Sequence, residues 1–229
     1  MIKKLTFTIL IAVTASIGFA QQNKIPFEKY GVAEGLPEEF VNTPLQDDKG
    51  FIWFGTQNGL VKYDGYHFKV YQQASVKKDS TGFQIKSSGG GLLKAKNGKI
   101  WIGETGGQGI VSSFDPLTEK FKNYYPSGNT PKGADESASQ LLFEDEAGNI
   151  WFKYRPGLAQ PFFICRLNPA TGVIKRYPVV DRVDRNIYLR SFGTVESSGT
   201  IWHQDNKNNF YRLNRQKDSF EIIIPAGKD

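Results

Sequence analysis

The chain has 229 residues, with 29 Lys and Arg against 23 Asp and Glu, 24 glycines, 11 prolines and one cysteine. Phe, Trp and Tyr make up 14% of the chain, which excludes an intrinsically disordered protein, and one cysteine excludes a small disulfide-stapled domain. Glycine and proline are far too few for a collagen-like chain. The composition predicts a globular chain of one large domain or two small ones.

Residues 1–20 have the pattern of a secretory signal peptide. Lys3 and Lys4 precede an apolar run that reaches Ile17, and small residues end the segment at Ala20. The run is shorter than the roughly 20 residues that span a bilayer, so a retained membrane anchor is the weaker alternative. We expect residues 21–229 to be exported to the periplasm. Loss of the two lysines lowers the net charge from +6 to +4, which does not indicate nucleic-acid binding.

Four tryptophans mark an internal repeat. They are separated by 48, 50 and 51 residues, each follows an isoleucine, and each has a glycine three positions before it. Glycine supplies the positive φ that a tight hairpin needs, so the repeat predicts a turn that leads into a buried strand. The repeated residues are Gly50 and Trp53, Gly98 and Trp101, Gly148 and Trp151, and Gly199 and Trp202.

Each tryptophan strand is followed by two more short strand patterns, and a weaker one precedes each glycine. Four antiparallel strands in a period of 40 to 50 residues are typical of a β-propeller blade, so we predict an all-β fold of four four-stranded blades. Independent hairpins or an open β-solenoid are the alternative. We expect the blades near residues 36–75, 85–126, 138–180 and 190–225, all within one propeller segment over residues 21–229.

The stretch from Gly35-Leu36-Pro37 through Asp47-Asp48-Lys49-Gly50-Phe51-Ile52-Trp53-Phe54-Gly55-Thr56 to Asp64-Gly65 resembles the two-component regulator propeller repeat. The resemblance is strong over residues 24–75 and looser in the last two repeats, where Lys153-Tyr154 and Gln204-Asp205 replace Gly-Thr. It implies a periplasmic sensor region of Bacteroidetes-type hybrid histidine kinases and response regulators. Such proteins continue into a Tyr-rich β-domain, a membrane span, a kinase and a DNA-binding output.

Residues Phe27-Glu28-Lys29-Tyr30 match the pattern of the outer strands but precede the first blade. The last repeat already has its own outer strand at Phe220–Ile223. We therefore expect residues 25–31 to complete a blade that lies outside this sequence, in an amino-terminal fragment of a ring of about seven blades. A simple leader segment or a distorted four-blade ring is the alternative.

Catalytic chemistry has little support. Only His67 and His203 could act as a histidine base, no Gly-x-Ser-x-Gly motif occurs, and Cys165 lies in a predicted core strand. Residues 205–209 lack the glycine and distal glutamate of a calcium loop. The glycines at 89–91 and 106–109 lack the Lys-Ser/Thr of a phosphate loop, and loop flexibility is the interpretation. We predict a non-enzymatic chain without metal or cofactor.

Propeller geometry predicts where a ligand would bind. Loops between the second and third strands, and segments between blades, open on one face around the channel. The predicted function is a periplasmic ligand-sensing domain of a two-component protein. An exported propeller lyase or hydrolase and an interaction scaffold are the alternatives. Expected partners are a small-molecule or oligosaccharide ligand, often glycan-derived, the missing downstream blades, and a second copy in the full-length protein, but no nucleic acid. The candidate ligand residues are Arg155, Gln160, Arg182, Arg185, Asp205 and Lys207.

Overall fold

The computed structural model describes residues 26–57, 59–71, 89–126, 137–157, 162–178, 193–195, 200–204 and 208–225. By its contacts the chain divides into two units, Met1–Tyr30 and Gly31–Asp229, and every described strand belongs to the second unit. This part of the chain is all-β, with strands β1 to β17 and one 3-10 turn, η1 (Val32–Glu34).

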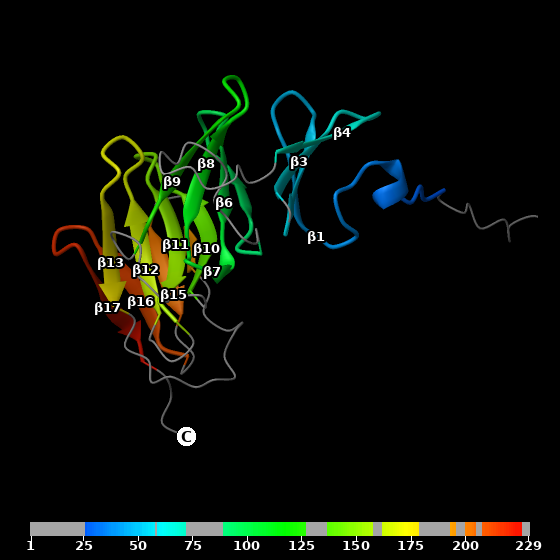
Figure 1. The fold of residues 1–229 in the computed structure, drawn as a ribbon. Coiled ribbons are helices and arrows are strands. Elements are labelled where there is room, and N and C mark those ends of the chain that lie inside the picture. Colours follow the sequence, from blue (N-terminus) through cyan, green and yellow to red (C-terminus); the bar gives the residue numbers. More distant parts are fainter. Residues whose placement is uncertain are drawn as a thin grey trace, which may run out of the picture. The chain divides into compact units, whose positions relative to one another are not determined.

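Four antiparallel sheets account for these strands, and their colours in Figure 1 follow the sequence from cyan to red. Blade 1 contains β1 (Val41–Gln46), β2 (Ile52–Thr56), β3 (Gly59–Tyr63) and β4 (Phe68–Tyr71). Blade 2 contains β5 (Leu92–Lys94), β6 (Ile100–Gly103), β8 (Val111–Asp115) and β9 (Lys120–Tyr124). Blade 3 contains β10 (Ser137–Glu144), β11 (Ile150–Arg155), β12 (Phe163–Leu167) and β13 (Ile174–Pro178). Blade 4 contains β14 (Gly193–Val195), β15 (Ile201–Gln204), β16 (Phe210–Asn214) and β17 (Ser219–Ile224).

Strands within each blade are hydrogen-bonded in chain order, so each blade is a meander joined by short turns. The fourth strand lies at the edge of its sheet in all four blades, as its alternating pattern predicts. The chain therefore folds as a four-bladed β-propeller segment.

In the first three blades the turn before the tryptophan strand contains a glycine with positive φ, and in two of them an aspartate stabilises it. Gly50 has a φ of 86°, which a residue with a side chain rarely adopts. The carboxylate of Asp47 accepts the backbone N–H groups of Lys49 and Phe51 and, at 2.8 Å, the indole N–H of Trp53. One carboxylate thus stabilises both the turn and the orientation of the buried ring.

Blade 3 repeats this arrangement and blade 2 lacks it. Asp145 accepts the indole N–H of Trp151 at 2.8 Å. The matching position in blade 2 is Ala95, and the indole N–H of Trp101 has no hydrogen-bond partner among the described residues.

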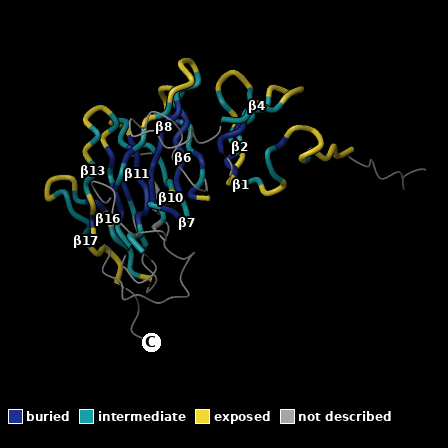
Figure 2. The backbone as a smooth tube through the Cα atoms, viewed as in Figure 1, coloured by how far each residue is buried: buried dark blue, intermediate teal, exposed yellow. Residues whose placement is uncertain are grey.

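Tryptophan rings fill the contacts between consecutive blades. Trp53 belongs to a core cluster with Ile100 and Phe114 of blade 2, Trp101 to one with residues of blade 3, and Trp151 to one with residues of blade 4. These three tryptophans are at most 1% exposed, whereas Trp202 is half-buried. Figure 2 shows the buried backbone concentrated in strands such as β6, β8 and β11, with exposed turns around them.

Two glycine-rich segments do not serve loop flexibility, contrary to the interpretation from sequence. A Cβ on Gly90 would lie 2.0 Å from the backbone oxygen of Ser139 in blade 3. In the second segment, β7 (Thr105–Gly107) pairs with β10 and extends the sheet of blade 3 to five strands. Both segments carry backbone of blade 2 close to blade 3, and at Gly90 the neighbouring backbone leaves no room for a side chain.

An interblade clamp joins the outer strand of one blade to a turn of the next. Lys69 and Tyr71 of blade 1 donate hydrogen bonds to the carboxylate of Glu119 in blade 2, at 2.6 and 3.0 Å. Lys175 and Tyr177 of blade 3 donate in the same way to Asp218 of blade 4, the tyrosine at 2.6 Å.

Between blades 2 and 3 the clamp has no acid. Lys122 and Tyr124 donate instead to the backbone oxygen of Pro169, at 3.4 and 3.3 Å. The position of the acid is taken by Gly172, which shares the positive φ of Glu119 and Asp218.

Residues 26–30 form no strand, and Phe27 is 91% exposed. The expectation that they complete a blade beyond this sequence stays a prediction. The signal peptide expected at residues 1–20 lies outside the described residues. In the part of the chain that the structure describes, no helix has the length and apolarity to cross a membrane.

Candidate functional site

Of the six candidate ligand residues, the structure describes Arg155 alone. Gln160, Arg182, Arg185, Asp205 and Lys207 lie outside the described residues. Whether these five meet Arg155 therefore stays a prediction.

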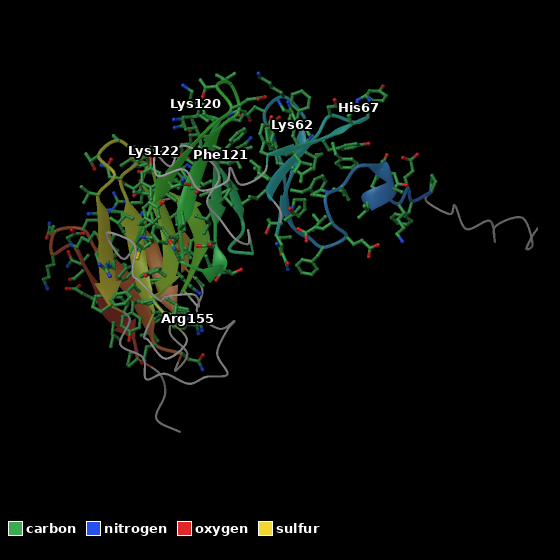
Figure 3. All side chains as sticks on the ribbon, viewed as in Figure 1. Lys62, His67, Lys120, Phe121, Lys122 and Arg155 are labelled. Atoms are coloured by element: carbon green, nitrogen blue, oxygen red, sulfur yellow. The ribbon has the colours of Figure 1, made fainter. Side chains whose placement is uncertain are left out.

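Arg155 is the last residue of β11, so it lies where the second strand of blade 3 runs into the loop to the third. Figure 3 shows it at the end of the strands opposite to Lys120 and Lys122. Its guanidinium carbon lies 5.7 Å from the ring centroid of Phe162, within the range of a cation–π contact. The side chain is half-buried. Arg155 thus presents a cation at the end of the blade where the sequence predicts a ligand.

Lys153 lies two residues before Arg155 and is 8% exposed. Glycine takes its place in the first two blades, as Gly55 and Gly103, and Gln204 takes it in blade 4. Burial lowers the pKa of the Lys153 ammonium to about 8. No ion pair joins it to another described residue. A lysine in such surroundings is a strong donor for an anionic or hydroxylated group.

Tyr154 points into the core that blade 3 shares with blade 2. The side chain is fully buried in a cluster with Trp101 and Val111. Its hydroxyl has no hydrogen-bond partner among the described residues. A buried hydroxyl without a partner carries a desolvation cost.

Blade 2 contributes a buried carboxylate at the equivalent strand end. Glu104 is 1% exposed, and its carboxylate accepts the N–H of Ile110 at 2.9 Å. Its backbone oxygen accepts the N–H of Ser139 at 2.7 Å, which ties it to β10 of blade 3. Burial, and to a smaller extent the Glu104 charge, raises the pKa of Tyr125.

The ends of β6 and β11 therefore hold the buried charged groups of Glu104 and Lys153 and the buried hydroxyl of Tyr154. Lys153-Tyr154 departs from the repeat pattern in the sequence, but neither these two residues nor Glu104 is among the six residues predicted to bind a ligand. The sequence does mark these positions, which lie two and three residues after each tryptophan. They are Gly55-Thr56 in blade 1, Gly103-Glu104 in blade 2 and Lys153-Tyr154 in blade 3.

Catalytic groups do not gather in the described part of the chain. Cys165 is fully buried, and burial raises the pKa of its thiol, so a reactive thiolate is disfavoured. His67 lies in an exposed turn, and its Nδ1 is 3.8 Å from Oδ2 of Asp64. Among the described residues no cluster of three His, Cys, Asp or Glu side chains could hold a metal ion.

A hollow of about 400 Å³ lies at the other end of blade 3. No sequence pattern predicts this hollow. Its two cations, Arg166 and Lys175, already form ion pairs with Asp218, so they are less available to a ligand than Lys153. The lining residues are Asn149, Arg166, Asn168, Thr171, Val173 and Lys175.

Comparison with known proteins gives one relative by sequence and several by fold. No family model matches the chain. A histidine kinase, P4, of Formosa agariphila is 38% identical over 53 residues, which are 23% of this chain and 4% of the kinase. The sequence similarity to this kinase is limited to that short segment.

Two solved structures share the fold. One is a catalytically inactive virginiamycin B lyase from Staphylococcus aureus with quinupristin, with a TM-score of 0.55 and 14% identity over 84% of this chain and 57% of the lyase. The other is the extracellular domain of a putative one-component system from B. thetaiotaomicron, with a TM-score of 0.54 and 17% identity over 89% of this chain and 28% of that one. The chain thus spans about half or less of these proteins.

Proposed function

We propose that this chain is the ligand-sensing propeller segment of an exported two-component signalling protein. The observation that carries the proposal is the 38% identity to a histidine kinase over 53 residues of a chain that folds as propeller blades. The fold is also that of an extracellular domain of a putative one-component system. Export through the signal sequence at residues 1–20 would place the sensor in the periplasm.

The ligand site in this proposal lies at the ends of β6 and β11. Lys153 and Arg155 supply cations at this end of blade 3. Gln160, Arg182, Arg185, Asp205 and Lys207 would add contacts from the neighbouring loops. Lysine and arginine side chains suit a small polar or anionic ligand, so we propose an oligosaccharide or a sugar acid released from a glycan.

We propose that the chain itself has no catalytic activity. Among the described residues no cluster of His, Cys, Asp or Glu could hold a metal ion, and burial disfavours the thiolate of Cys165. Likeness to a lyase at 14% identity is a likeness of fold, so it adds no chemistry to the alternative of a lyase or hydrolase.

Thermal unfolding of the purified chain with a panel of neutral and acidic oligosaccharides tests the proposal. A true ligand raises the melting temperature in proportion to the logarithm of its concentration. Arg155→Gln should abolish the rise, whereas the control Lys120→Gln, an exposed residue at the other end of the strands, should leave it unchanged.

Two outcomes would contradict the proposal. If no compound in the panel raises the melting temperature, an interaction scaffold becomes the better explanation. If a compound is consumed during incubation with the chain, as chromatography of the mixture would show, the non-enzymatic assignment is wrong.

A further inference from the structure

Lys153 lies on the face of blade 3 that packs against blade 4. Side chains alternate between the two faces along β11, so Lys153 shares its face with Trp151 and Arg155. Trp151 belongs to a core cluster with Ile201 of blade 4. Two cations therefore follow the tryptophan along one face, toward the end of the strands where Figure 3 shows Arg155.

The row of paired residues that crosses blade 3 at Lys153 is apolar on one side and polar on the other. Lys153 pairs with Ile164, and Ile164 pairs with Tyr177, both at most 4% exposed. On its other side Lys153 pairs with Gln140 of β10, which is exposed. Paired side chains on one face lie close together, so the ammonium can be approached from the β10 side, beside a polar amide.

This end of blade 3 has two positive charges, and the residues paired with them include no acid. Arg155 pairs with Ala138, and Lys153 pairs with Gln140 and Ile164. Desolvation lowers the pKa of the Lys153 ammonium to about 8, and no neighbouring carboxylate opposes this shift, so the group is still protonated at neutral pH. A buried cation without a counter-ion among the described residues costs folding free energy, and such groups are typical of binding sites.

Comparison with blade 2 shows that Lys153 also affects how closely two blades can meet. Gly103 occupies the equivalent position, and a Cβ there would lie 2.5 Å from the backbone oxygen of Ser139 in blade 3. Blade 3 therefore approaches blade 2 so closely at this point that a side chain would not fit. The long side chain of Lys153 is incompatible with such an approach, so blades 3 and 4 cannot meet in the same way around it.

We propose that Lys153 and Arg155 bind the oxyanion of an acidic sugar, a carboxylate or a sulfate ester, from the β10 side of blade 3. This inference rests on the proposed ligand-sensing function and narrows its ligand to an acid. The lysine provides a compact ammonium and the arginine a planar fork of N–H donors, which together suit the several oxygens of such a group. A neutral sugar would leave the buried Lys153 without a counter-charge.

Nuclear magnetic resonance of the lysine ε-methylene groups tests the contact at Lys153 itself. The spectrum of Lys153→Met identifies the signal by the loss of one peak. Glucuronate and galacturonate are the carboxylate probes, glucose 6-sulfate is the sulfate-ester probe, and glucose and galactose are the matched neutral sugars. We expect at least one acid to shift the Lys153 signal until saturation, whereas the neutral sugars leave it in place. The acid that does so shows which oxyanion the site takes.

Three variants separate charge from structure. Lys153→Met should weaken binding of that acid by about tenfold or more in Kd, measured by isothermal titration calorimetry. Lys153→Arg keeps the cation and should retain most of the affinity. Lys120→Met removes an exposed lysine at the other end of the strands and should bind as the wild type does. Far-ultraviolet circular dichroism identifies any variant that fails to fold.

Several outcomes would overturn the inference. They are a Lys153 signal that no acid shifts, an equal shift with the neutral sugars, and a folded Lys153→Met that binds the acid as tightly as the wild type. If neutral oligosaccharides still raise the melting temperature in any of these cases, the sensing function stands and the acidic ligand alone is wrong. If no oligosaccharide, neutral or acidic, binds the chain, the sensing function fails as well.

Discussion

At the scale of single residues, Lys153 is the most unusual side chain of the described structure, because a lysine that is 8% exposed replaces the glycine of blades 1 and 2. Its pKa is lowered to about 8, so folding disfavours the protonated form. Below pH 8 the folded protein carries the full cost of this buried charge, and the cost disappears as the pH rises toward the ordinary lysine pKa of about 10.4.

Replacement of this lysine should therefore stabilise the protein. We expect Lys153→Met to raise the free energy of unfolding by about 1–3 kcal/mol at pH 7, and the gain should shrink between about pH 8 and pH 10. Denaturant unfolding at several pH values measures it. Lys120→Met, at an exposed position, is the control and should give no comparable gain. An equal or lower stability for Lys153→Met would show that the ammonium has a compensating partner.

The indole hydrogen bond in the turns supports a second prediction. Asp145→Ala removes the acceptor of the buried Trp151 N–H and should cost about 1–3 kcal/mol in denaturant unfolding. The opposite change, Ala95→Asp, supplies the missing acceptor beside Trp101 in a turn with the same backbone hydrogen bonds and should be neutral or stabilising. If Ala95→Asp destabilises as much as Asp145→Ala, the cost of burying the carboxylate exceeds the value of the bond.

These residues show what sequence could and could not provide at this scale. Glycine and tryptophan recur at a fixed spacing, so their structural roles follow from the repeat and from the φ that glycine allows. The carboxylate–indole bond joins residues six apart across a hairpin and occurs in two of the first three blades, so periodicity alone does not reveal it. The burial of Lys153 and Glu104 depends on how two blades meet, which no local pattern contains.

At the scale of elements, the interblade clamp links strand and turn by charge. Partial burial raises the pKa of Asp218, but hydrogen bonds from Lys175 and Tyr177 and the charge of Arg166 outweigh this and lower it. A carboxyl whose folded pKa is lowered stabilises the fold above its unfolded pKa, about 3.9, and this contribution is lost as the pH falls through the folded value.

The lowered pKa of Asp218 predicts that the stability difference between the wild type and a variant of the clamp depends on pH. Asp218→Asn should lower the melting temperature at pH 7, where the wild type has an ionised carboxylate, and the deficit should narrow as the pH falls below about 4. Differential scanning calorimetry across this range measures both. A deficit that stays constant with pH would mean that shape and hydrogen bonding, and not charge, hold the clamp.

The elements also show why one interpretation from sequence was wrong. A run of glycines has the same composition whether it forms a flexible loop or lies between two backbones. Gly90 lies between two backbones and β7 forms a strand, and in both cases the partner, Ser139 or β10, comes from the next blade. Strand order within a blade was predictable from turn spacing, whereas the strand that crosses to the neighbouring sheet was not.

At the scale of the whole molecule, burial differs among the blades. The ten largest fully buried side chains all come from blades 1, 2 and 3, and none comes from the described residues of blade 4. Trp101, Phe114, Trp151 and Phe152 are among them. Blade 4 also exposes three isoleucines on its outer strand. When each repeat contacts mainly its neighbours, stability is roughly a sum of repeat and interface terms, so a blade with weaker contacts can open separately.

Hydrogen exchange followed by mass spectrometry tests this gradient. We expect peptides from β6 and β11 to exchange most slowly and peptides from β15 to β17 to exchange earlier, in a separate step, because blade 4 has less buried apolar surface. Asp218→Ala removes the clamp between blades 3 and 4 and should speed exchange in β16 and β17 while leaving β2 and β3 unchanged. Uniform exchange of all four blades would mean that they unfold as one cooperative unit.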